Sequence, residues 1–369
     1  MKVSDGKVFF YYFYDVADEI DLKKVEAILK ENVLETGLNV YRRLTPEYIT
    51  YAVPPLLIKL VAKDFEFKKK KAKIHLYAKL FDFGAIVLIA NTEFKESLGE
   101  LNEFASDLYL QPELEQVVKE YRDRLLKRVT PALTNPAQKP YFKEDYIIYY
   151  IKKFEKKATA AELAKAHEKE IANLLRFESG NLSEEEIKGV WQNKTSYYAN
   201  ELVLVDFNAA FVYDETEPEP LDLFNVLEYA KLQLLELRYY DSVLDKAIAK
   251  THDDLGKLNK LVVFFKTAKI MQDLSEIKLN VSEIIEKIDN ALKLIGDMYL
   301  VKVYSIAGHE FHLVEWEENV KKKLALIAEI YGKLEARVNN MRFTLLEGLL
   351  VCLELIFIYL WIGEILHWF

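Results

Sequence analysis

The sequence is poor in cysteine and glycine: its 369 residues include one cysteine, Cys352, and 12 glycines. A single cysteine excludes a disulfide within the chain and a zinc site built on the cysteines of one chain. Loops that cradle phosphate need glycine where the backbone approaches the ligand, and neither GxGxxG nor GxxxxGK[ST] occurs. These absences disfavour a nucleotide-dependent enzyme.

Sequence patterns typical of hydrolases and metalloenzymes are missing as well. No GxSxG motif occurs, and Cys352 lies in the most apolar stretch of the chain, where packing is expected rather than nucleophilic chemistry. The run HEFH at 309–312 has its histidines three residues apart, whereas zincins need HExxH so that both imidazoles lie on one helix face. We therefore predict no catalytic residues, no metal site and no cofactor.

The charge of the chain disfavours direct nucleic-acid binding. The net charge is -9, while nucleic-acid affinity depends on many lysine and arginine contacts. The basic run KKKK at 68–71 lies between two alternating apolar segments, which is typical of a solvated hairpin turn. The N-terminal MKVSDGKVFFYYFYD carries charges beside its apolar run and has no small-residue cleavage site, so we expect no secretory signal.

Aromatic residues, in contrast, are abundant. The chain has 23 tyrosines and 21 phenylalanines, concentrated in runs such as FFYYFY at 9–14 and YIIYYI at 146–151. Such runs favour β-strands, because flat side chains pack well on a pleated surface. Helical patterns follow each group of expected strands, so the sequence predicts an α+β fold.

Two stretches of the chain resemble each other. LFDFGAIVLIANTEF begins at position 80 and LVDFNAAFVYDETEP at position 204, and both pass from an acidic-aromatic corner through an apolar run to a Thr-Glu pair. The corners are Asp82-Phe83 and Asp206-Phe207. We predict an internal duplication of β-α-β-β-α units about a pseudo-twofold axis, with Phe83 and Phe207 in equivalent positions. The alternative is two unrelated hairpins of similar composition.

The pattern divides the chain into four parts. The loop TPALTNPAQKP at 130–140 holds three prolines and is the predicted linker between a first repeat, 1–130, and a second, 141–255. In the third part, 256–342, apolar residues recur every three or four positions in two series, which predicts an antiparallel helical or coiled-coil stalk that turns near the glycine at 308. Such stripes need partner helices.

The fourth part, FTLLEGLLVCLELIFIYLWIGEIL at 343–366, is a predicted transmembrane helix. As a helix, its 24 residues reach roughly 36 Å, enough for a hydrocarbon core of about 30 Å. Its fifteen Leu, Ile, Val and Phe residues contribute about -7 kcal/mol to insertion, and the central Glu354 costs about 3 kcal/mol. Lysines and arginines precede the segment and none follows, which places the N-terminal bulk in the cytoplasm or on a matrix-equivalent side. The alternative is a buried helix in a soluble assembly.

Two acidic residues share one side of this segment. Glu347 and Glu354 are seven residues apart and therefore lie on one helical stripe. Carboxylates in lipid must face protein or water, and a lone helix offers no such shelter. We predict that Glu347 and Glu354 hold several copies of the chain together as a homo-oligomer.

The segment FDFGAIVLIAN at 81–91, the long helical region and the terminal RFTLLEGLLVCLELI at 342–356 resemble the required-for-meiotic-nuclear-division family. That family has a domain of unknown function and a C-terminal transmembrane helix with two acidic positions, which Glu347 and Glu354 match. The resemblance implies an oligomeric anchor without enzymatic activity. Eukaryotic members include mitochondrial inner-membrane proteins that support organellar translation, which implies a ribosome-associated partner.

The sequence thus favours a homo-oligomeric, single-pass membrane-anchored scaffold or adaptor whose cytoplasmic α+β head binds an unidentified protein or a ribosome-associated partner. Two alternatives stay open. Asp82 and Asp206 could form a carboxylate pair at the repeat interface of a metal-dependent hydrolase or nuclease, although an aspartate that closes a tight turn explains them more simply. Glu347 and Glu354 could instead line a pore or a transport path.

Overall fold

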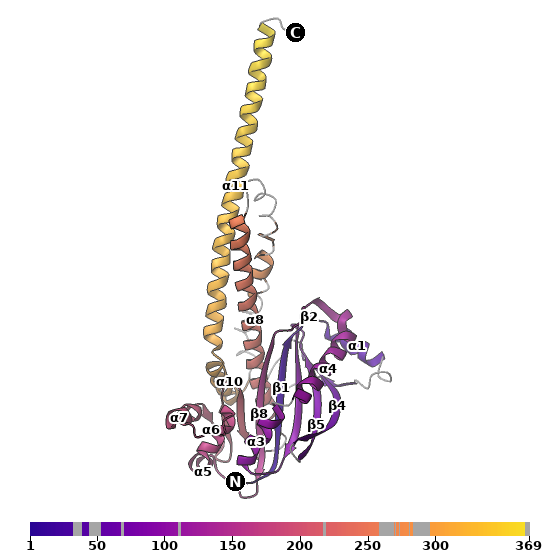
Figure 1. Ribbon diagram of the computed structural model, residues 1–369, viewed down its shortest axis with the longest axis vertical. Coiled ribbons are helices and arrows are strands. Elements are labelled where there is room, and N and C mark those ends of the chain that lie inside the picture. The colour runs from indigo at the N-terminus through magenta and orange to yellow at the C-terminus, as the bar shows by residue number, and fades with distance from the viewer. Residues whose placement is uncertain are drawn as a thin grey trace. The chain divides into compact units, whose positions relative to one another are not determined.

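The computed structural model describes residues 1–31, 39–43, 53–67, 70–109, 112–216, 219–257, 269, 271–272, 274–279, 281–282 and 296–365. The chain forms two compact units (Figure 1). The first, here called the head, comprises Met1–Tyr239 and Ile288–Glu315. The second, the helical unit, comprises Tyr240–Lys287 and Trp316–Phe369. The prediction of an α+β fold followed by a helical region is confirmed.

Within the described residues, nine strands of the head form one sheet. Their order across the sheet is β3 (Asn39–Arg43), β4 (Leu56–Phe67), β5 (Lys70–Leu80), β6 (Ala85–Phe94), β1 (Val3–Asp15), β8 (Lys143–Phe154), β11 (Ala209–Tyr213), β10 (Leu202–Val205) and β9 (Lys194–Thr195). Neighbours pair antiparallel except β8 and β11, which are parallel. A separate pair joins β2 (Ala17–Ile20) to β7 (Leu133–Pro136).

Helices pack on the sheet of the head and make up the helical unit. Those of the head are α1 (Leu22–Glu31), α3 (Leu98–Tyr109), α4 (Pro112–Val129), the 3-10 helix η1 (Thr130–Ala132), α5 (Ala160–Ala166), α6 (Glu168–Arg176), α7 (Glu184–Gln192) and α10 (Met298–Glu310). The long helices α8 (Leu221–Lys257) and α11 (Leu313–Ile365) each have residues in both units.

Both faces of the central strands are buried, which explains their nearly unbroken aromatic runs. Successive side chains of a strand point to opposite faces. Phe10, Tyr12 and Tyr14 of β1 belong to the main apolar core, on the face that α3 and α4 cross (Figure 1). Phe9, which directly precedes Phe10 in sequence, faces α8, where its ring centroid lies 5.2 Å from that of Phe224.

The structure does not confirm the predicted duplication. Both acidic-aromatic corners join antiparallel hairpins, β5–β6 and β10–β11, but β6 runs antiparallel to β1 whereas β11 runs parallel to β8. The turns also differ. The Phe81 N–H donates to the Ala85 carbonyl across the first corner, and the Asp206 N–H donates to the Ala209 carbonyl across the shorter second corner. Similar local sequences gave similar hairpins, but long-range pairing arranged them differently.

The first corner depends on its glycine. Gly84 has φ +95°, and a Cβ built on it would lie 1.7 Å from the Ala17 carbonyl oxygen. Its own carbonyl accepts from the Val16 N–H, and the neighbouring Asp82 carbonyl accepts from the Ile20 N–H. The second corner has Asn208 at the position that corresponds to Gly84. The two corners therefore differ in the backbone conformation that they require.

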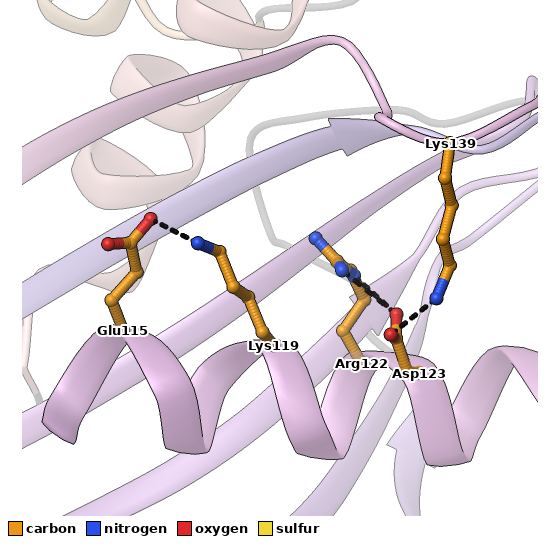
Figure 2. A network of polar contacts seen from close by, with 5 residues as sticks. All are labelled: Glu115, Lys119, Arg122, Asp123 and Lys139. Atoms are coloured by element: carbon orange, nitrogen blue, oxygen red, sulfur yellow. Dashed lines mark hydrogen bonds and ion pairs between the residues drawn. The ribbon is translucent and has the colours of Figure 1, made fainter. Parts of the chain in front are cut away.

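The segment predicted as a linker, 130–140, is part of the head. Its strand β7 pairs with β2, and Lys139 forms an ion pair with Asp123 of α4 (Figure 2). Asp123 also accepts from Nε of Arg122 at 2.9 Å, and the Arg122 guanidinium lies 4.5 Å from the centroid of the Tyr14 ring. The predicted repeats 1–130 and 141–255 therefore contribute to one sheet, in which β1 and β8 pair along their lengths. Proline content marks a loop locally and cannot reveal a distant strand partner.

The helical unit covers much of the apolar stripe of α11 within the chain itself. Val320, Ile327 and Leu334, spaced seven residues apart, are all buried. Lys323 of α11 pairs with Asp241 and Asp245 of α8 at 2.7 and 2.6 Å. The predicted coiled-coil arrangement is not confirmed, because half of its first stripe, at positions 284, 288, 291 and 295, lies outside the described residues.

The turn predicted around 305–308 lies a few residues further along the chain. The helix α10 continues through Gly308 and ends at Glu310, and the chain turns at Phe311 and His312 before α11 begins. His312 has φ +55°, the left-handed conformation that ends helices. A glycine in a helical pattern is tolerated when the surrounding residues favour the helix, so Gly308 alone did not mark the break.

Candidate functional site

The C-terminal part of α11 exposes a large, mostly apolar surface. Among the described residues, α11 is the one helix long and apolar enough to cross a membrane by length and composition, and none of its most apolar window is buried within the chain. The large apolar side chains from Phe343 to Ile362 are 43% to 70% exposed. Soluble monomers rarely expose so large an apolar patch, so this surface is the first candidate site.

The predicted oligomerisation residues lie on this surface. Glu347 and Glu354 are both exposed on α11, and the described residues offer neither of them a hydrogen-bond or ion-pair partner. Their seven-residue spacing places them on one side of the helix, as expected. The native cysteine, Cys352, is exposed between them. The prediction that the carboxylates bind other copies of the chain stays a prediction.

A second group of candidate residues is buried between the sheet and α8. Lys79 of β5 is 2% exposed, and its Nζ donates to Glu228 Oε1 at 2.6 Å and to Asn225 Oδ1 at 2.8 Å. Glu228 is also 2% exposed. Burial raises the pKa of the Glu228 carboxyl above its usual range, and the Lys79 ammonium opposes this shift. The pair is compensated by hydrogen bonds, as a buried ion pair must be.

Lys231, one turn further along α8, is buried without such compensation. It is 1% exposed, and its Nζ lies 3.9 Å from Glu144 Oε2, beyond hydrogen-bond distance. The Nζ instead lies 4.3 Å from the ring centroid of Phe207, 4.6 Å from that of Phe311 and 5.4 Å from that of Tyr146. These three rings form what we call the Lys231 cage. Such contacts attract a cation but replace only part of its hydration.

Glu144, the carboxylate nearest Lys231, is shared with Arg238. The Arg238 guanidinium makes a hydrogen-bonded ion pair with Glu144 Oε1. Burial raises the pKa of Glu144, and Lys231 and Arg238 oppose that shift. Burial also lowers the pKa of Lys231 to about 8, which the Glu144 carboxylate opposes. The free energy that the Lys231 ammonium loses by leaving water is therefore larger than the free energy that its charged neighbours restore.

The two predicted corner aspartates are not brought together. β1 and β8 lie between the two hairpins, so the mid-lines of the hairpins are about 19 Å apart across the sheet, since neighbouring strands lie about 4.8 Å apart. The corners are also offset along the strands, because Ala85 lies opposite Asp15 of β1, whereas Ala209 lies beside Ile147 of β8, which is opposite Phe10. Asp206 is 1% exposed, with its Oδ2 3.0 Å from Arg176 Nε and its Oδ1 accepting from the Phe207 N–H at 2.7 Å. This is the geometry of an aspartate that closes a turn. The carboxylate pair required by the hydrolase alternative does not form.

The second corner acquires a contact that local sequence could not predict. Phe207 belongs to the Lys231 cage, whereas Phe83 packs on Phe81 with centroids 5.2 Å apart. Lysines such as Lys79 and Lys231 lie within otherwise apolar stretches, and a charged residue inside an apolar pattern is the available sequence signal for a buried ion. Their partners come from strands far away in the chain, so the pairings had no local signal.

Fold and surface together define a mixed α+β protein with one helix long and apolar enough to cross a membrane. The chain belongs to the family described as "Uncharacterized protein MJ0711, N-terminal domain", whose model matches residues 5–219. It is 28% identical over 227 residues to the uncharacterized protein MJ0711 of Methanocaldococcus jannaschii, an alignment that covers 61% of this chain and 67% of that protein. No solved structure matches the chain.

This membership corrects the predicted family. The resemblance to the required-for-meiotic-nuclear-division family rested on an acidic-aromatic-glycine corner and on a terminal apolar helix with two glutamates. The matching family model instead covers most of the head and stops before α8. Short corners and apolar helices recur in unrelated proteins, because each solves a local problem of backbone geometry or burial.

Proposed function

We propose that this protein is a membrane-anchored, homo-oligomeric scaffold, with the C-terminal part of α11 as its anchor and the α+β head as a protein-binding module without catalytic activity. The observation that carries the proposal is the apolar window of α11, none of which is buried within the chain. That exposure argues against a helix buried in its own fold. Either lipid or another protein must cover it.

Energetics favour lipid as the main cover. The fifteen Leu, Ile, Val and Phe residues of 343–366 contribute about -7 kcal/mol to insertion, which exceeds the cost of about 3 kcal/mol for a central glutamate. The basic residues lie upstream, among them Lys333 and Arg342. By the positive-inside tendency this arrangement supports a cytoplasmic head. Trp361, 64% exposed near the far end, suits the opposite interface.

The glutamates support self-association of the anchor. A carboxylate or carboxyl group in lipid is stable only against protein or water, and Glu347 and Glu354 share one side of the helix. Several parallel copies would place these groups against one another. The apolar stripe of the helical unit gives less support for self-association, because Val320, Ile327 and Leu334 are already buried within the chain.

Membrane fractionation with two matched leucine variants tests the anchor. Leu353 and Leu326 are 47% and 43% exposed on the same helix, but only Leu353 lies in the proposed span. Leu353→Lys should release a large part of the protein from alkaline-washed membranes, because a charge at the span costs about 3 kcal/mol. Leu326→Lys should leave the distribution unchanged. A wild-type protein found in the soluble fraction would refute the proposed anchor.

Sizing in mild detergent tests the oligomer separately. Glu354→Leu removes an unfavourable insertion contribution, so membrane association should persist while the oligomer becomes smaller or more heterogeneous. Glu335→Leu, at an exposed position of α11 before the span, is the matched control and should keep the wild-type size. A wild-type chain that is monomeric in detergent would contradict the scaffold proposal. Ion flux through liposomes that contain the protein would favour the pore alternative.

A further inference from the structure

Lys79 and Lys231, the buried lysines among the described residues of the head, differ in how their charges are compensated. The Lys79 Nζ has a carboxylate and an amide oxygen at hydrogen-bond distance. The Lys231 Nζ has no hydrogen-bond acceptor among the described residues, and its nearest carboxylate oxygen, on Glu144, is 3.9 Å away. An ammonium has three N–H donors, so the closed head desolvates Lys231 without replacing its bonds to water. This imbalance favours any motion that returns the group to water.

The lid over Lys231 is the corner between α10 and α11. Phe311 is fully buried, and its ring meets Tyr146 edge-on at 5.4 Å and Phe207 at 6.2 Å. The residue sits between two helix ends rather than inside a helix, with its N–H donating to the Ala307 carbonyl. The next residue, His312, has φ +55° and is exposed. Such a corner can move without breaking the hydrogen bonds of either helix body.

We propose that the α10–α11 corner is a hinge that opens by withdrawing Phe311 from the Lys231 cage, and that hydration of the Lys231 ammonium drives the opening. The hinge lies immediately before α11, the helix that carries the proposed anchor. Its opening would loosen the start of that helix on the head. This inference does not depend on the anchor, since every residue involved belongs to the head.

The protonation state of Lys231 sets the equilibrium between the closed and the open state. The charged groups around Lys231 are Glu144 and Asp145 on β8 and Arg238 on α8, with Glu310 and Asp206 near the Tyr146 ring of the cage. In the closed head, burial lowers the pKa of Lys231 to about 8, below the ordinary 10.5 that it regains when hydrated. The hydrated, open state therefore binds more protons between these values. Closure is weakest below pH 8 and strengthens as the pH rises toward 10.5.

Competitive amine labelling of the full-length chain in detergent, read out by mass spectrometry, tests the hinge. Lys231 and Lys79 are 1% and 2% exposed, so a rigid head would protect both equally. The hinge predicts that Lys231 reacts at least about tenfold faster than Lys79, and that its rate stops rising near pH 8, while the rates of exposed lysines keep rising toward pH 10. The plateau follows because deprotonation also favours closure.

Variants at the lid separate a local hinge from general unfolding. Phe311→Leu should accelerate labelling of Lys231 severalfold and leave the labelling of Lys79 unchanged, because the substitution removes an aromatic ring that covers Lys231 only. Phe224→Leu, which thins the packing of α8 on Phe9, is the matched control and should not accelerate Lys231 selectively. Equal labelling of Lys231 and Lys79 in the wild-type chain would overturn the proposal. So would a Phe311→Leu variant that exposes both lysines alike.

Discussion

At the scale of single residues, the buried charges of this head are compensated unequally. Lys79 and Glu228 are compensated by short hydrogen bonds, Glu144 by Arg238, and Lys231 mainly by aromatic rings. None of these pairings could be read from the sequence, since each joins residues from distant parts of the chain. The sequence did indicate that the corner aspartates close turns, as Asp206 does through the Phe207 N–H.

Removing Lys79 should be costly because it leaves its partner behind. Lys79→Met would strand the Glu228 carboxylate in a buried site, at a cost of about 3–5 kcal/mol in the free energy of unfolding. Adding Glu228→Leu should recover most of that loss, because an apolar pair of similar volume needs no compensation. Thermal or urea unfolding of the two variants checks this. A double variant as unstable as the single one would show that packing, and not charge, dominates the site.

Asp15 should make the free energy of unfolding depend on pH with the opposite sign from that of most carboxylates. Burial and the neighbouring Asp18 raise the pKa of Asp15 to about 7, whereas the unfolded value is near 3.8. The folded head therefore binds more protons between these values, and Asp15 lowers stability as pH rises through 7. Asp15→Asn should stabilise the head at pH 8 by up to roughly 4 kcal/mol and have little effect at pH 4. Urea unfolding at both pH values measures the difference, and equal effects would contradict the shift.

At the scale of elements, local patterns identified most strands and helices but not their partners. The runs at 9–14 and 146–151 became β1 and β8, and the corners at Asp82 and Asp206 became hairpins. The parallel pairing of β8 with β11 and the pairing of β7 with β2 were missed, because neither depends on neighbours in sequence. The stripe of α11 was recognisable for the same reason that strands were: its period is a local property.

Two adjacent residues of α11 test the register of that stripe. Ile327 is 1% exposed and Leu326 is 43% exposed, although both are large and apolar. Ile327→Ala should destabilise the helical unit by about 2–5 kcal/mol through lost burial and a residual cavity, while Leu326→Ala should change stability by less than about 0.5 kcal/mol. Hydrogen exchange along α11 distinguishes the two. Similar effects at both positions would mean that α11 does not present this side to its neighbours.

At the scale of the whole molecule, the sequence predicted an α+β head, a helical region and an apolar end, and the structure has these parts. What the sequence could not supply was the family and the sharing of one sheet by both predicted repeats. The family rests on similarity over residues 5–219 and the shared sheet on long-range strand pairing, so neither depends on any short motif. The proposed function requires that lipid covers the exposed end of α11.

The native Cys352 allows that claim to be measured directly. It is the single cysteine of the chain and lies exposed in the middle of the proposed span. A fluorophore attached to Cys352 in reconstituted vesicles should be quenched by spin labels on lipid acyl chains and not by aqueous iodide, because the span places it inside the hydrocarbon core. Strong quenching by iodide, or none by the lipid spin labels, would contradict the membrane anchor.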